Sequence, residues 1–250
     1  MRTGALLFFR PRQELSIALL LMALCVGVNF ISDLFRGTIL FYALYQGLLA
    51  LGVCIFAPLW LTRFWRKEPL SSIGVTGERW VRAALIGAVL AAVSIAARLM
   101  GMRIVLPEIT TLAYLSAGMA MSSLFEELFF RGYLQTRFER SFGIVPAVIL
   151  SAACFSIYHL GYSFVRGNID ELPTLFGIGV FFSISFRITG SIITSYVVNL
   201  PHAILTFIAD PAYASNLSRF TVASAVISLA TMAAALALIA FMDIATSKPA

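Results

Sequence analysis

Eight long apolar segments separated by short polar breaks dominate this chain of 250 residues. By hydropathy they cover residues 15–32, 39–62, 81–101, 110–133, 144–163, 173–187, 190–209 and 221–242. Segments of this length match the hydrocarbon layer that an α-helix crosses while satisfying its own backbone hydrogen bonds. They are too long for the alternating strands of a membrane β-barrel. We therefore predict an all-α, polytopic transmembrane bundle of about eight helices that forms one integral membrane domain over residues 1–250.

The basic residues predict how the bundle lies in the membrane. Only 12% of the residues are charged, against about 25% in soluble domains. If the N-terminus is cytoplasmic, 13 of the 18 Lys and Arg side chains fall on the inner side, and five fall at the outer ends: Arg36, Arg98, Arg103, Arg166 and Arg219. This asymmetry predicts cytoplasmic N- and C-termini in a prokaryotic inner (plasma) membrane. The charges flank spans and form no single face, so they favour lipid head groups over nucleic acid as the partner.

Three charged residues lie inside the fourth apolar segment: Glu126, Glu127 and Arg131. Each ionised group costs roughly 2.5–3.5 kcal/mol to insert in hydrocarbon, so we infer that these three residues have a function. On a helix, Glu127 and Arg131 are four positions apart, where opposite charges pair, while Glu126 is turned about 100° from its neighbour. We predict that Arg131 neutralises Glu127 and that Glu126 faces a reactant. The alternative is an ion pair with a structural role only.

Three further polar residues lie inside later spans: His159, Asn199 and His202. Glu126 precedes the turn near residue 142 by 16 positions and His159 follows it by 17, so at about 1.5 Å per residue both lie roughly 25 Å from that turn. Asn199 and His202 share a helical face, and His202 is closer to this depth. We therefore predict that His202, rather than Asn199, points at Glu126 and His159. We also expect His202→Ala to reduce activity more than Asn199→Ala.

A carboxylate and imidazoles in a partly dry cavity suit hydrolysis. Glu126 could take a proton from water as general base, and His159 could hold the same water. Asn199 or His202 could stabilise an oxyanion, a contribution of about 3–4 kcal/mol in known cases. Two histidines and a glutamate can also bind zinc, but the chain has no His-Glu-x-x-His sequence. We expect no cofactor, with zinc as the alternative.

These motifs resemble a known family. Glu126-Glu-x-x-x-Arg131 followed by Gly-Tyr, then Phe155-x-x-x-His159 and a third polar cluster on a later helix, is similar to the CAAX-protease and bacteriocin-processing (Abi) family of intramembrane endopeptidases. The likeness covers roughly residues 70–205. It implies that Glu126 activates water, that Glu127 and Arg131 support it, and that His159 is a water ligand.

The third motif departs from the pattern of this family, which usually has His-x-x-x-Asn. Asn199 occupies the histidine position and Ala203 the asparagine position, while His202 is out of register. The resemblance implies an endopeptidase that hydrolyses a peptide bond in a membrane-associated protein or peptide. The altered motif leaves an alternative, a catalytically inactive member that acts as a membrane scaffold, immunity factor or partner-binding protein. A transporter would require repeat symmetry, which the sequence does not show.

Overall fold

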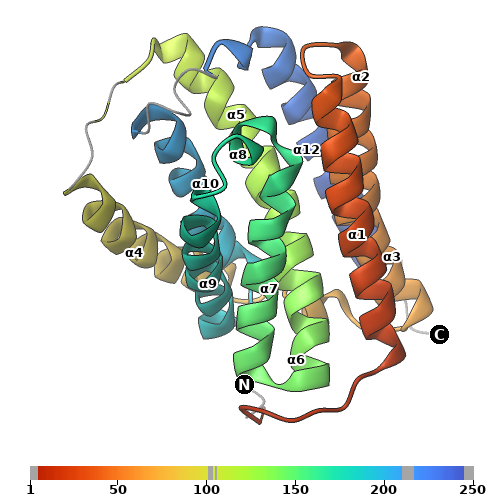
Figure 1. Ribbon diagram of the computed structural model, residues 1–250. Helices are drawn as coiled ribbons and strands as arrows, with labels where there is room; N and C mark the ends of the chain where they lie inside the picture. The colour runs from red at the N-terminus through yellow and green to blue at the C-terminus, as the bar shows by residue number, and fades with distance from the viewer. Residues whose placement is uncertain (1–4, 101–103, 105, 210–216, 245–250) are drawn as a thin grey trace.

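The computed structural model describes residues 5–100, 104, 106–209 and 217–244, and these residues form helices and connecting turns without any strand. The elements follow in this order: α1 (Gln13–Leu34), α2 (Ile39–Tyr42), η1 (Ala43–Phe56), α3 (Ala57–Trp60), η2 (Leu61–Trp65), η3 (Leu70–Ile73), α4 (Trp80–Leu99), α5 (Ile109–Glu126), η4 (Glu127–Gln135), α6 (Thr136–Phe142), α7 (Ile144–Tyr158), η5 (His159–Gly161), α8 (Ser163–Arg166), α9 (Glu171–Thr189), α10 (Ile192–Ala209), η6 (Leu217–Arg219) and α12 (Val222–Ile244). Figure 1 shows them as one bundle, with α4 leaning outward beside α10.

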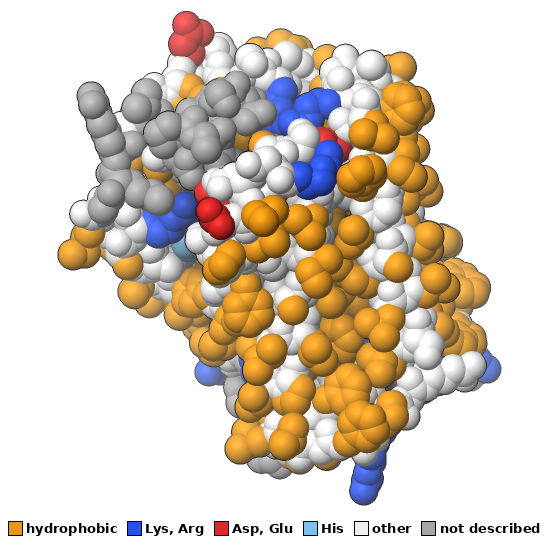
Figure 2. Space-filling view, viewed as in Figure 1, with side chains coloured by type: hydrophobic (Ala, Val, Ile, Leu, Met, Phe, Trp, Pro, Cys, Tyr) orange, Lys and Arg blue, Asp and Glu red, His pale blue; other side chains and the backbone are white. Residues whose placement is uncertain are grey.

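Seven helical segments in the described part of the chain are long and apolar enough to cross a membrane. The remaining predicted segment, the fourth (110–133), corresponds to α5 and η4, which continue without interruption into α6. The prediction of an all-α membrane bundle of about eight helices is thus confirmed. Figure 2 shows broad hydrophobic surface over the lower part of one face, as expected of a surface in contact with lipid.

Parts of two spans are π-helical, which the sequence analysis did not anticipate. The second span contains the π-helices η1 and η2, and the fourth contains η4, which begins at Glu127. Two neighbouring helices hold η4 in place: the Ser151 hydroxyl donates to the Phe130 carbonyl at 2.8 Å, and the Gln135 amide donates to the Ser183 carbonyl at 3.1 Å. Because π-helical turns are often found at functional sites, the change of helix type beside the carboxylates indicates that this region is a candidate functional site.

The segment α5–η4 runs through the middle of the bundle and packs against η1, α7, α10 and α12 (Figure 1). Its aromatic side chains Phe125, Phe129 and Phe130 are fully buried. Gly132 allows the short helix η3 to approach η4 closely, because a Cβ atom at this position would lie 2.7 Å from the Ile73 carbonyl oxygen. The polar residues of η4 are therefore set in a tightly packed apolar core.

A network of ion pairs closes the end of the bundle where α6 meets α7. Arg137 donates to Glu14 at 3.0 Å and to Glu68 at 3.2 Å, and Arg140 donates to Glu68 at 2.7 Å. Burial alone would raise the pKa of Glu68, but the hydrogen bonds and charges of Arg140 and Arg137 lower it to about 2. This network joins the start of α1 and the loop after η2 to α6.

The opposite end carries the arginines that the sequence places at the outer ends of the spans. Arg36 and Arg166 both pair with Asp33, while Arg98 and Arg219 line the same cavity as Arg36. Arg103 lies outside the described residues. The described members of the predicted outer group therefore do gather at one end.

Candidate active site

Glu126 and Glu127 lie where α5 passes into η4, and the structure gives them different environments. Glu126 lines a cavity of about 630 Å³, whereas the side chain of Glu127 is fully buried. The Glu127 carboxylate lies 3.6 Å from Nε of Arg131. The prediction of one paired carboxylate and one that faces open space is confirmed in its geometry.

Arg131 is held behind the cavity by aromatic rings and a backbone oxygen. Its guanidinium carbon lies 4.4 Å from the centre of the Phe155 ring and 5.4 Å from that of Phe182. Its Nη2 atom donates to the Gly179 carbonyl at 3.1 Å. Contacts of this kind stabilise a desolvated guanidinium. Arg131 is therefore a fixed positive charge between Glu127 and α9.

Asn199 joins the two carboxylates. From α10 its side-chain nitrogen donates to Glu126 at 3.2 Å and to Glu127 at 2.8 Å. Both hydrogen bonds go to carboxylates, which are stronger acceptors than neutral groups. Asn199 therefore holds the two glutamates in one geometry, and the remaining oxygen of Glu126, Oε1, accepts no hydrogen bond from any described residue.

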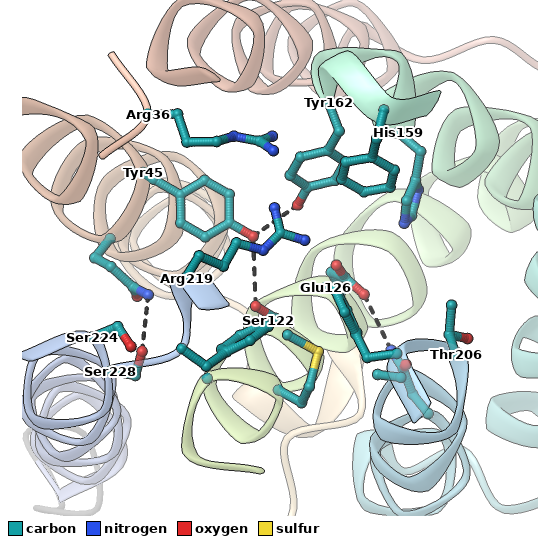
Figure 3. Close-up of a pocket in the computed structure, with 18 of the residues that line it drawn as sticks. Arg36, Tyr45, Ser122, Glu126, His159, Tyr162, Thr206, Arg219, Ser224 and Ser228 are labelled. Atoms are coloured by element: carbon teal, nitrogen blue, oxygen red, sulfur yellow. Dashed lines mark hydrogen bonds between the residues drawn. The ribbon is translucent and has the colours of Figure 1, made fainter. Parts of the chain in front are cut away.

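His159 is the first residue of η5, directly after α7, and its ring also lines the cavity. One ring nitrogen, Nδ1, lies 2.8 Å from the Phe155 carbonyl oxygen. Because a carbonyl oxygen only accepts, Nδ1 must carry the proton, and Nε2 of the neutral ring is left as an acceptor. Figure 3 shows the His159 ring and Glu126 directed into the same space. The two residues thus share one cavity, and a single water molecule that bridges them stays a prediction.

The prediction that His202, rather than Asn199, points at Glu126 is wrong. His202 lines the cavity, but its Nε2 atom lies 2.6 Å from the Ser94 hydroxyl and its Nδ1 atom 3.3 Å from the Arg98 guanidinium. Both partners belong to α4. Depth along α10 does not determine which way a side chain points. Helix α4 packs against α10 (Figure 1), and its Ser94 and Arg98 side chains contact the His202 ring.

Tyr45 and Tyr162 line the cavity, and no motif in the sequence predicts this; Tyr158 lies behind them. The Tyr45 and Tyr162 hydroxyls lie 2.7 Å apart, and Tyr158 lies 2.7 Å from Tyr162. Tyr45 also reaches the Ser122 hydroxyl at 3.5 Å. The one signal in the sequence was the position of Tyr158 and Tyr162 on either side of His159; nothing there indicated Tyr45, which comes from η1.

The cavity reaches the surface at the arginine-rich end. Exposed residues at its rim come from the α1–α2 turn and from the segment before α12, namely Gly37, Ser218 and Thr221. Deeper in, its wall combines aromatic side chains with Glu126, His159 and Asn199. Among the described residues, no group of three or more His, Cys, Asp or Glu side chains is arranged to hold a metal ion. The site thus offers a carboxylate, an imidazole acceptor and an apolar wall.

Comparisons with known proteins support the resemblance seen in the motifs. Residues 107–208 match the family model described as type II CAAX prenyl endopeptidase Rce1-like. Neither the curated proteins nor the solved structures include a match to the chain. The matched segment contains Glu126, Glu127, Arg131, His159, Asn199 and His202. Over residues 107–208, the chain is therefore similar to the type II CAAX prenyl endopeptidases of the Rce1-like family.

Proposed function

We propose that this protein is an intramembrane endopeptidase in which Glu126 activates a water molecule. The observation that carries the proposal is that Glu126 and His159 line one cavity, while Asn199 donates hydrogen bonds to both Glu126 and Glu127. A general base needs an acceptor within reach of the water. Oε1 of Glu126, which accepts no hydrogen bond from the described residues, is such an acceptor.

In this mechanism a water molecule donates hydrogen bonds to Oε1 of Glu126 and to Nε2 of His159. As its oxygen attacks the scissile carbonyl carbon, Glu126 takes one proton and the carbonyl oxygen becomes an oxyanion. Glu126 then returns the proton to the leaving nitrogen as the C–N bond breaks. The products are a carboxylic acid and an amine, and the net reaction consumes one water.

Glu127, Arg131 and Asn199 support this chemistry without touching the substrate. Arg131 offsets one of two adjacent negative charges, and Asn199 donates to both carboxylates. Without these contacts the two glutamates would repel each other in an apolar core. Support of this kind keeps Glu126 in the position that the reaction requires.

The substrate we propose is a membrane-associated peptide or protein segment that enters from the arginine-rich end of the bundle. We further propose a multi-pass location in a prokaryotic plasma membrane with cytoplasmic termini, because the excess of basic residues lies at the other end. The cavity would then open to the outer side. No metal takes part in the proposed mechanism.

The test is cleavage by purified protein reconstituted in liposomes. Peptides ending in a CAAX-type sequence, with and without a prenyl group, are incubated with the wild type, Glu126→Gln and the matched control Glu108→Gln, which alters an exposed glutamate at the start of the same helix. Cleavage should be lost in Glu126→Gln, retained in Glu108→Gln and unaffected by a chelator. Equal activity of Glu126→Gln and the wild type would refute the mechanism. A cellular phenotype that survives Glu126→Gln would favour a scaffold.

A further inference from the structure

The guanidinium groups of Arg36 and Arg219 line the open end of the cavity, whereas Glu126 is the one carboxylate in the lining of the cavity. Arg36 pairs with Asp33, but Asp33 is shared with Arg166 at 3.2 Å. One carboxylate therefore serves two guanidinium groups at the rim.

Arg219 is bound by aromatic rings in place of an acid. Its guanidinium carbon lies 5.1 Å from the centre of the Phe207 ring, 5.4 Å from that of Phe164 and 5.5 Å from that of Phe220. No carboxylate in the described part of the chain lies within ion-pair distance of it. Aromatic faces hold a guanidinium group while its N–H donors stay available at its edge.

The surroundings of Arg219 also disfavour its charge. Burial and the neighbouring charge of Arg36 lower the pKa of Arg219 to about 10, so the group stays charged at neutral pH but lacks the stabilisation that an anion would supply. An anion between Arg36 and Arg219 would offset both the desolvation and the mutual repulsion. The electrostatics at this place are therefore complementary to a negative ligand.

Arg219 projects from η6 into the cavity that holds Glu126 and His159 (Figure 3). Arg36 lies across from it, and the Tyr45 and Tyr162 hydroxyls lie close to it in the same view. An anionic group bound here shares one enclosed space with the carboxylate of Glu126. It is most simply part of the molecule on which Glu126 acts, since a separate lipid head group would have to leave the lipid-facing surface to enter.

We propose that Arg219 and Arg36 form a carboxylate-binding subsite that anchors an acidic group of the peptide substrate. This inference rests on the proposed function and adds a specificity to it. A guanidinium group offers paired N–H donors that match the two oxygens of a carboxylate. The same chemistry would hold a C-terminal α-carboxylate or the side chain of an Asp or Glu residue, and anchoring either one would fix which peptide bond reaches Glu126.

The test measures binding separately from catalysis. Full-length Glu126→Gln protein in detergent is titrated with three fluorescent versions of one aliphatic heptapeptide: the free acid, the C-terminal amide, and the amide with one internal Glu. Fluorescence anisotropy gives each dissociation constant. We expect at least one carboxylate peptide to bind about tenfold or more tightly than the neutral amide, as expected for hydrogen bonds to a charged group. The peptide that gains affinity identifies the source of the carboxylate.

Substitutions then assign the effect to the subsite. In the Glu126→Gln background, Arg219→Gln should remove the preference for the carboxylate, and Arg219→Lys should keep part of it. Arg82→Gln, which removes an exposed arginine near the start of α4, should leave it unchanged. If Arg219→Gln fails to fold, the proposal is still tested by the affinities of the carboxylate and amide peptides for the protein with Arg219 intact.

Equal or undetectable binding of the three peptides would overturn the proposal, as would an Arg219→Gln variant that keeps the full preference. Arg219→Gln could instead change the dependence of protein stability on phosphatidylglycerol in nanodiscs, with no peptide preference; the ligand would then be a lipid head group and the proposal would be wrong. If the wild type cleaves no peptide but the carboxylate preference is present, the proposed function is refuted and the subsite is not. The reverse result would refute the subsite alone.

Discussion

Replacing Asn199 should damage activity more than replacing His202, the reverse of what the sequence predicted. Asn199 donates to Glu126 at 3.2 Å and to Glu127 at 2.8 Å. A hydrogen bond to a charged group contributes about 1.5–3 kcal/mol. If Asn199→Ala removes one such contribution to the stabilisation of the transition state, kcat falls by about 10- to 150-fold.

His202→Ala should cost less, because it removes contacts to Ser94 and Arg98 on α4 and none to the carboxylates. We expect a fall in kcat of less than about fivefold, together with a lower melting temperature as α4 loosens from α10. Cleavage rates of both variants in liposomes, measured beside their melting temperatures in detergent, separate the two effects. Near-normal activity in Asn199→Ala with a large loss in His202→Ala would refute the assignment and restore the order expected from the sequence.

Three further predictions concern packing, charge and orientation. Gly132→Ala should destabilise the protein by about 1–3 kcal/mol, because the added Cβ atom would lie 2.7 Å from the Ile73 carbonyl oxygen; Gly47→Ala, which meets nothing within 4 Å, is the control, and equal melting temperatures would contradict the prediction. The stability that Glu68 contributes should decline below pH about 4.5 and be lost near pH 2, since its folded pKa of about 2 lies below the ordinary value of 4.5. After discounting for solvent screening, we expect a loss of about 1 kcal/mol in the free energy of unfolding. In Glu68→Gln the melting temperature should change less with pH over that range. Ser218→Cys should react with an impermeant maleimide added outside intact cells, whereas Ser71→Cys should react only after permeabilisation; the opposite labelling would reverse the proposed orientation.

The sequence was sufficient for the architecture because hydropathy and length are local properties. The predicted segment 39–62 is part of the observed span Ile39–Trp65, and segment 144–163 corresponds to Ile144–Gly161. The π-helical turns could not be predicted in the same way. At least η4 has partners distant in sequence, such as Ser151, whose hydroxyl donates to the Phe130 carbonyl oxygen, and local hydropathy carries no information about them.

The site was predictable where spacing along a single helix or hairpin decided the outcome. The Glu127–Arg131 pair follows from a spacing of four positions on a helix, and the presence of Glu126 and His159 in one cavity follows from equal distances to one turn. The partner of Asn199 depended on the rotation of α10 about its axis, which spacing along the chain does not determine. Tyr45 entered the cavity from a helix that carried no motif at all.

The hydrogen bonds of His202 show how one helix serves two different neighbours. Arg98 can only donate, so Nδ1 of His202 accepts, and Nε2 carries the proton toward Ser94. The Ser94 hydroxyl donates in turn to the Ala91 carbonyl at 3.0 Å. Every donor therefore finds an acceptor only if the imidazole is neutral. Protonation would place an N–H group against the Arg98 cation and weaken the attachment of α4. On α10, Asn199 thus orients the two carboxylates. His202, three residues later, attaches α4 to α10 at the wall of the same cavity.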